Sequence, residues 1–298
     1  MKINYKNSLS DKFLAKLPHY LSVFTIILGS TLGSMNSANA VNQTITATTD
    51  DIDATMISNA GTDDIILDPA GSGTVATLAL AVANVTDFTL SGDTAGTVIL
   101  KVANTGAITL APDLDVTSSK HGTLAVEFAT ADTAPLLVTY SGAVASTGTS
   151  AITVGSSTTA GNISFTKAGA AMVADTVTIT GGDHADEDST ATFTDAVTTT
   201  SISLDDNTGT AKAVFSTAGT DTIAGTIDGA AAGEGTVQVT GATKTFSGII
   251  GATSIGTLDV DATAVFSASV AATNILIADS TTATFNGSTS NSCTIKSS

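Results

Sequence analysis

The sequence lacks several residue types on which many protein classes depend. Its 298 residues include no arginine, no tryptophan, one cysteine and four prolines, and aromatic residues make up 4% of the chain. Ten lysines stand against 27 acidic residues, for a formal net charge of -17. Because nucleic acids and anionic membranes bind basic protein surfaces, this balance excludes both as partners. The single cysteine, Cys293, cannot form an internal disulfide framework, so packing and hydrogen bonding must stabilise the fold.

Small and β-branched residues dominate what remains. The chain contains 55 threonines and 27 glycines, and 42% of its residues are hydrophobic, with a mean hydropathy of +0.34. Threonine and the other β-branched residues fit a pleated sheet better than a helix. A positive hydropathy is not typical of intrinsic disorder, which combines low hydrophobicity with high charge. The composition therefore predicts an all-β fold with a buried core.

The N-terminal 40 residues resemble a secretory signal peptide. Residues 1–20 carry four lysines and one acid, residues 21–28 are mostly apolar, and a small-residue segment ends at Ala38-Asn39-Ala40. A positive region, a short apolar region and an A-x-A site predict cleavage after Ala40. The alternative is a permanent membrane anchor. It is disfavoured because polar and glycine residues in 29–34 interrupt the apolar run before the roughly 20 residues that a bilayer requires. We expect an exported mature chain without a membrane-spanning segment.

A phenylalanine-marked phrase recurs from residue 189 onward. Each phenylalanine follows a Thr/Ala/Val-rich phrase, and the intervals between them are similar except for a longer one between Phe215 and Phe246. Apolar residues recur four and nine positions after the phenylalanine in three of the five units. The phenylalanines are Phe193, Phe215, Phe246, Phe266 and Phe285; the following residues are Val197, Ile250 and Val270, and then Ile202, Ile255 and Ile275.

These repeats predict a stacked architecture. Residues two or four apart share one face of a strand, so a break at residues 198–201 or 251–254 must reset the alternation. A unit of about 20 residues cannot bury its apolar face alone, and stacking such units as a parallel β-solenoid (β-helix) creates one continuous core. We expect clear coils over residues 189–288, degenerate coils over 41–188 and a tail at 289–298. A pair of β-sandwich domains is the alternative, and the scarcity of aromatic residues disfavours it.

The repeated phrase also resembles a known family. The pattern x-Ala-Thr-Phe-x-x-x-Val, followed by Ile-x-Ile/Leu and an acidic corner, is similar to repeats of autotransporter passenger domains, especially the rickettsial outer membrane protein B group. The resemblance is clear over residues 189–288. It implies a surface-displayed passenger that serves as an adhesin, surface antigen or coat protein. The translocator barrel of that family is absent from this sequence. The resemblance therefore leaves two alternatives: a passenger fragment of a longer or split gene, or a protein that is released or held by other means.

Few residues of the sequence are candidates for catalysis or metal binding. The densest charged segment, residues 181–188, contains Asp183, Asp186, Glu187 and Asp188, whose oxygens are the ligands that Ca²⁺ prefers. The segment lacks the spacing of an EF-hand or a calcium-binding β-roll, so a solvated loop is the alternative. His121 beside Lys120 could be assembled into a serine–histidine–acid site or a polysaccharide-lyase site. No nucleophile elbow and no arginine support either reading.

The sequence therefore predicts a protein that is not an enzyme and needs no cofactor, with Ca²⁺ as the one candidate ion. We expect a secreted or cell-surface β-solenoid that acts as an adhesin or surface antigen on a host or neighbouring cell. The alternative is a structural subunit that associates with itself in a surface-layer (S-layer) coat. The sequence leaves the receptor, the mode of anchoring and the oligomeric state open.

Overall fold

The structure, a computed structural model, describes residues 137–216 and 219–289 without interruption. It also describes the segments 43–45, 49–52, 63–67, 75–78, 85–91, 98–104, 107–111, 113–116, 118–128 and 294–297. The predicted signal peptide, its cleavage residues Ala38 and Ala40, and Cys293 lie outside the described residues. The chain from Asn42 to Ser298 forms one compact unit.

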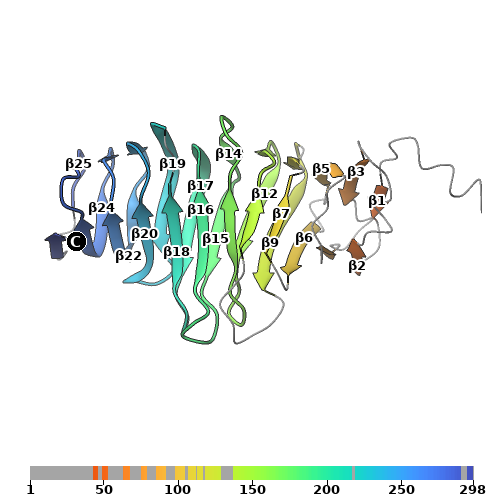
Figure 1. The fold of residues 1–298 in the computed structure, drawn as a ribbon, viewed down its shortest axis with the longest axis horizontal. Helices are drawn as coiled ribbons and strands as arrows, with labels where there is room; N and C mark the ends of the chain where they lie inside the picture. Colours follow the sequence, from red (N-terminus) through yellow and green to blue (C-terminus); the bar gives the residue numbers. More distant parts are fainter. Residues whose placement is uncertain are drawn as a thin grey trace, which may run out of the picture. The chain divides into compact units, whose positions relative to one another are not determined.

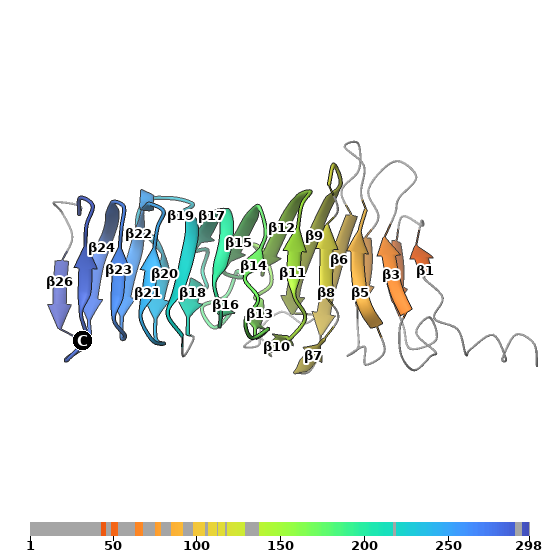
Figure 2. The same ribbon diagram turned by 90° about the horizontal axis from the view of Figure 1, so that it is seen from above.

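This unit is an all-β parallel β-solenoid, as the sequence predicts (Figures 1 and 2). Pairings between its named strands are parallel, and no helix is present among the described residues. Each coil places strand segments on three faces, so a strand pairs with the strand one coil before it and one coil after it. Partners in adjacent coils lie about 25 residues apart, which is longer than the predicted unit of about 20 residues. The coils are shorter near the C-terminal end, where Phe246 pairs with Phe266 and Phe266 with Phe285.

Within each coil, the strand on the first face is followed by a corner and then by the strand on the second face. Val138 pairs with Ile163, Ile163 with Ala191 and Ala191 with Ala213, and each of these steps is one coil. The face is continued by the C-terminal parts of β22 (Ile250–Val260) and β24 (Val270–Ile277). Its other strands are β7 (Ile108–Leu110), β10 (Val138–Tyr140), β13 (Asn162–Phe165), β16 (Ser189–Phe193), β18 (Ala211–Phe215), β20 (Glu234–Val239) and β26 (Thr294–Ser297). The last of these lies within the segment predicted as a tail.

The second face is the one that is interrupted. Its first strands form a separate five-stranded sheet, and its later strands belong to the larger sheet. The five are β1 (Gln43–Ile45), β3 (Asp63–Leu67), β5 (Val85–Leu90), β8 (Asp113–Val116) and β11 (Val144–Ser146). The later ones are β14 (Met172–Val173), the N-terminal parts of β17 (Val197–Asp205) and β19 (Asp221–Gly229), β21 (Lys244–Phe246), β23 (Ala264–Phe266) and β25 (Ala283–Phe285).

The third face is continuous through the described strands. Its members are β2 (Thr49–Ile52), β4 (Val75–Leu78), β6 (Val98–Asn104), β9 (His121–Phe128), β12 (Thr149–Val154), β15 (Thr176–Thr180) and parts of β17, β19, β22 and β24. The inward residues of β12 and β15 alternate with outward ones, as expected for strands with one buried side. Apolar side chains from all three faces meet in one core.

Two long strands turn the corner between faces where the sequence predicts a break. The pairing register shifts between Thr198 and Ser201 in β17, and between Ile250 and Ile255 in β22. In β19, Gly225 lies above the β17 corner with φ +107°, and a Cβ there would collide with the carbonyl oxygen of Thr199. Glycine is required because no other residue combines this conformation with so close an approach of two backbones.

A column of aromatic rings runs through the core. Neighbouring ring centroids are 4.9 to 6.0 Å apart, and the five phenylalanines of the sequence repeat all belong to the column. Aromatic pairs at such distances stabilise beyond the area they bury, by about 0.5–1.5 kcal/mol each. The rings are Tyr140, Phe165, Phe193, Phe215, Phe246, Phe266 and Phe285, of which Phe285 is partly exposed.

The column changes face between Phe215 and Phe246. Phe215 lies on the first face and pairs with Val239, whereas Phe246 lies on the second face and pairs with Ile223. These two rings meet edge-on, with an interplanar angle of 88°, whereas the flanking phenylalanine pairs stack at 6° to 21°. The longer interval between these two phenylalanines in the sequence is therefore more than one coil.

The change of face also separates residues that the sequence phrases align. Val197 follows Phe193 as Ile250 follows Phe246, yet the two residues belong to different ladders. Val197 pairs with Ile223 on the second face, and Ile250 pairs with Ile227 and Val270 on the third face. Similar local phrases thus fold into strands on different faces.

A buried ion pair lies beside this change of face. The Lys244 side chain is fully buried, and its Nζ donates to the Gly219 carbonyl at 2.7 Å and to Asp221 Oδ2 at 3.1 Å. Asp221 is the partner of Lys244 in the preceding coil, and Ala264 is its partner in the next. A lysine therefore occupies the interior position that alanine occupies in the following coils.

Candidate functional site

The acidic residues at the corners of the solenoid join adjacent coils. Among the described residues, six aspartates accept a hydrogen bond from a backbone N–H that lies 22 to 30 residues away, which is one coil. The contacts are Asp113 from Ala143, Asp175 from Ser150, Asp188 from Thr210, Asp195 from Gly169, Asp206 from Gly235 and Asp228 from Thr253. At corners, where strand pairing stops, such bonds satisfy peptide groups that would otherwise lack partners.

The acidic segment predicted as a calcium site directs its four carboxylates to different places. Glu187 is buried, and its Oε2 accepts a hydrogen bond from the His184 N–H at 3.3 Å. Asp188 Oδ1 accepts from both the N–H and the hydroxyl of Thr210 at 2.8 Å. Asp183 Oδ1 lies 3.8 Å from His184 Nε2, and Asp186 is exposed.

In this arrangement the carboxylates have different partners, and the calcium site stays a prediction. Calcium takes six to eight oxygen ligands at about 2.3–2.6 Å, whereas the carboxylates of Glu187 and Asp188 turn toward different backbone groups. No group of three or more histidine, cysteine or acidic side chains in the described parts of the chain could hold a metal ion. His121 begins β9, and its backbone pairs with Thr149 of the next coil.

The interruption of the second face is the most distinctive surface feature. β11 ends the five-stranded sheet and β14 belongs to the larger sheet, so no hydrogen-bonded pairing joins these neighbouring strands. The other two faces stay continuous at the same level, because Val138 pairs with Ile163 and Ile152 pairs with Val177. The gap between β11 and β14 is therefore confined to one face.

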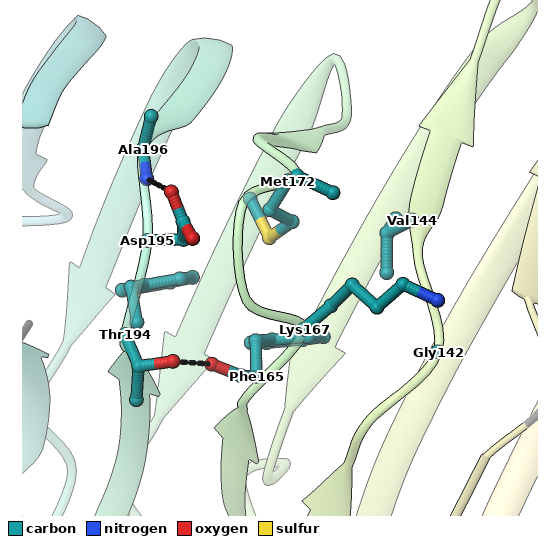
Figure 3. A pocket seen from close by; sticks show the side chains of 10 residues that line it. Gly142, Val144, Phe165, Lys167, Met172, Thr194, Asp195 and Ala196 are labelled. Carbon is teal, nitrogen blue, oxygen red and sulfur yellow. Dashed lines mark hydrogen bonds between the residues drawn. The ribbon is translucent and has the colours of Figure 1, made fainter.

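A small recess opens at one end of this break (Figure 3). Its enclosed volume is about 10 Å³, which is the space of a single water molecule. Lys167 extends along it, with the Lys167 Nζ 3.5 Å from Asp113 Oδ1, and both side chains are about half exposed. Asp195 accepts from the Ala196 N–H at 2.9 Å beside it. The Lys167–Asp113 ion pair thus links the loop before β14 to β8, across the break.

A second, larger recess opens at the other end of the break. Its volume is about 170 Å³, and it lies at the corner between the second and third faces. Its lining mixes hydroxyl-bearing and small apolar residues with one acidic residue, Asp175, and includes no lysine or aromatic ring. The lining residues are Ser146, Val173, Ala174, Asp175, Thr198, Thr199 and Thr200.

Two carboxyl groups on the outer surface have perturbed acidity. Partial burial, and secondarily the charge of Asp113, raise the pKa of Asp115 above its ordinary value. Partial burial, and secondarily the charge of Asp261, raise the pKa of Asp259, although Lys212 acts in the opposite direction. Gln238 Nε2 donates to both Asp259 Oδ2, at 3.2 Å, and Asp261 Oδ2, at 2.8 Å. The amide thus bridges two carboxylates that repel one another.

Comparisons with known proteins returned nothing: no family model, no curated protein and no solved structure matches this chain. Among the described residues, we find no helix that could cross a membrane.

Sequence reasoning did not identify the break or its recesses. The only sequence signal there is the weaker repeat before residue 189, which indicates irregular coils without locating them. Sequence reasoning identified an acidic corner in the repeat and the acidic segment 181–188, but not the aspartates that join adjacent coils. The available signal was an aspartate near each corner, roughly one coil from a backbone N–H that has no strand partner.

Proposed function

We propose that this chain is an exported, non-enzymatic surface protein that acts as an adhesin or surface antigen, in the manner of an autotransporter passenger. One observation carries the proposal: the described core is filled by side chains, while hydroxyl and carboxyl groups cover the corners and outer strands. A solenoid built in this way offers a long contact surface rather than an enclosed binding site. Its chemistry is that of recognition by hydrogen bonds.

The sequence supports the same proposal independently of the fold. The signal-like N-terminus favours export, and the Thr/Ala/Phe phrase is similar to passenger repeats of the rickettsial outer membrane protein B group. The proposed partner is a receptor on a host or neighbouring cell.

Two measurements test this proposal. Antibodies against the solenoid should label intact cells that produce the chain, and the purified protein should bind partner cells saturably. Protein retained inside the producing cells after fractionation, or absence of saturable binding, would contradict it. An ordered surface lattice in electron micrographs, together with a failure to bind other cells, would replace the adhesin by a self-associating surface-layer coat.

A further inference from the structure

The peptide groups that border the break between β11 and β14 point into it. The Met172 and Ala174 N–H groups donate to the carbonyls of Ala196, just before β17, and Thr198, in β17, at 2.9 and 3.1 Å. Because peptide groups alternate in direction along a strand, those of Val173 point the other way, toward β11. Directly after β11, the Thr147 N–H donates to the Val116 carbonyl of β8 at 2.9 Å, which directs the peptide groups of Ser146 toward β14.

These groups have no strand partner across the break, so they need polar partners of another kind. An added polypeptide strand cannot supply them. It would require a further spacing of about 4.8 Å between coils, and the continuous first and third faces hold the coils at one strand spacing. The occupant must therefore be small.

The recess beside these peptide groups has a size and a chemistry that select its occupant. Its volume of about 170 Å³, on the measure by which the smaller recess has about 10 Å³, is enough for several water molecules or one small polar ligand. The exposed side chains of Thr198 and Thr200 bring hydroxyls, which both donate and accept hydrogen bonds. Ser146 Oγ already donates to the Gly148 carbonyl at 3.0 Å, so it remains able to accept.

The charge of the recess excludes an anion. The acidic residue Asp175 lines it, with its Oδ2 accepting from the Ser150 N–H at 2.7 Å, and no lysine lies among the lining residues. No aromatic ring lies among the lining residues, so a flat aromatic ligand would find no stacking partner there. A compact ring that carries several hydroxyls, neutral or with an amino group, satisfies the donors and acceptors that are present.

We propose that this recess binds one sugar-sized polyhydroxyl ring, as a terminal unit of a glycan on the contacted surface. The proposal rests on the proposed adhesin function and names its ligand class. A site of this size binds weakly by itself, and a dissociation constant near 1 mM corresponds to about 4 kcal/mol. Display of many copies on a cell surface would raise the overall binding through multivalency.

The test uses the full-length protein, coupled in many copies to fluorescent beads, on an array of neutral, amino-sugar and sialylated glycans. Thr198→Val together with Thr200→Val removes two hydroxyls and keeps the β-branched shape that strands favour. Thr190→Val on the first face is the matched control, because its side chain also lies on the solvent side of a strand. We expect capture on neutral or amino-sugar glycans, at least a tenfold loss in the double variant and no change in the control.

Several outcomes would overturn the recess as a sugar site. They are no capture on any glycan, equal capture by the double variant, or capture only on sialylated glycans. Competition by free monosaccharide tests whether the recess binds the terminal unit of a glycan. Inhibition at millimolar concentration supports such a site, and no inhibition contradicts it. If the wild-type protein and the double variant adhere equally to cells, the recess proposal fails and the adhesin proposal stands. If neither adheres, the adhesin proposal fails.

Discussion

The buried pair of Lys244 and Asp221 offers a direct test of whether Lys244 is a buried cation in the solenoid core. Substituting Asp221→Ala leaves the Lys244 ammonium fully buried without its carboxylate, although it keeps the Gly219 carbonyl. Substituting Lys244→Met removes the buried charge and keeps a side chain of similar length. Comparing the two variants separates the free-energy cost of a buried charge without its partner from the net contribution of the ion pair to stability.

Their expected effects differ in sign. Removing one partner of a buried ion pair costs about 3–5 kcal/mol, whereas an apolar replacement of similar volume is often neutral or stabilising by about 1–4 kcal/mol. Because Asp221 keeps 16% of its side-chain surface exposed, we expect a loss near the lower bound, about 3 kcal/mol. At about 2–4 °C per kcal/mol for a domain of this size, Asp221→Ala should lower the melting temperature by about 6–12 °C.

The assay is thermal unfolding followed by far-ultraviolet circular dichroism, with Lys212→Met as the control for loss of a lysine on the outer side of β18. Lys244→Met should melt at or above the wild-type temperature, and the control should melt within about 2 °C of it. If Asp221→Ala melts with the wild type, or if Lys244→Met is the more damaging change, Lys244 is not a buried cation and the reasoning is refuted.

Three further predictions follow from the same structure. Phe215→Leu and Phe246→Leu, alone and combined, should show a coupling of about 0.5–1.5 kcal/mol in a double-mutant cycle of chemical unfolding, because their rings meet edge-on at 5.2 Å; additive losses would contradict this contact. Gly225→Ala should destabilise more than Gly169→Ala, since both glycines have positive φ but only at Gly225 would a Cβ meet a carbonyl oxygen; equal melting temperatures would count against the corner geometry. Asp259→Asn should raise the melting temperature at pH 7, because burial and Asp261 disfavour the folded-state carboxylate and raise its pKa. That gain should shrink as the pH falls through the raised pKa, where the wild-type carboxyl binds its proton, and a gain independent of pH would contradict it.

Much of the fold can be predicted from local sequence patterns. Alternation around Phe193 and Phe266 specifies strands with one buried side, and the small-residue breaks at 198–201 and 251–254 coincide with the observed register shifts. Each of these features depends on close neighbours along the chain. The chain therefore carries enough local information to specify a stacked all-β architecture.

The features missed by sequence reasoning depend on contacts between coils. The phrase around Phe246 is like the phrase around Phe193, but only the pairing of Phe246 with Ile223 places it on another face. The break between β11 and β14 is an absence of pairing, so no residue marks it. The role of the Asp206 carboxylate likewise appears only when the Gly235 N–H, one coil away, lies 2.8 Å from its Oδ2.

The order of the coils can be measured directly by disulfide trapping on a Cys293→Ser background. Outward residues that pair across adjacent coils have Cα atoms at a spacing that a disulfide can bridge. Val214 pairs with Gln238 on the first face, whereas the repeated phrase would align Val214 with Thr245, which pairs with Thr222 on the second face. The structure predicts that Val214→Cys with Gln238→Cys oxidises readily and that Val214→Cys with Thr245→Cys does not. The reverse pattern would contradict the solenoid register and the change of face within the aromatic column.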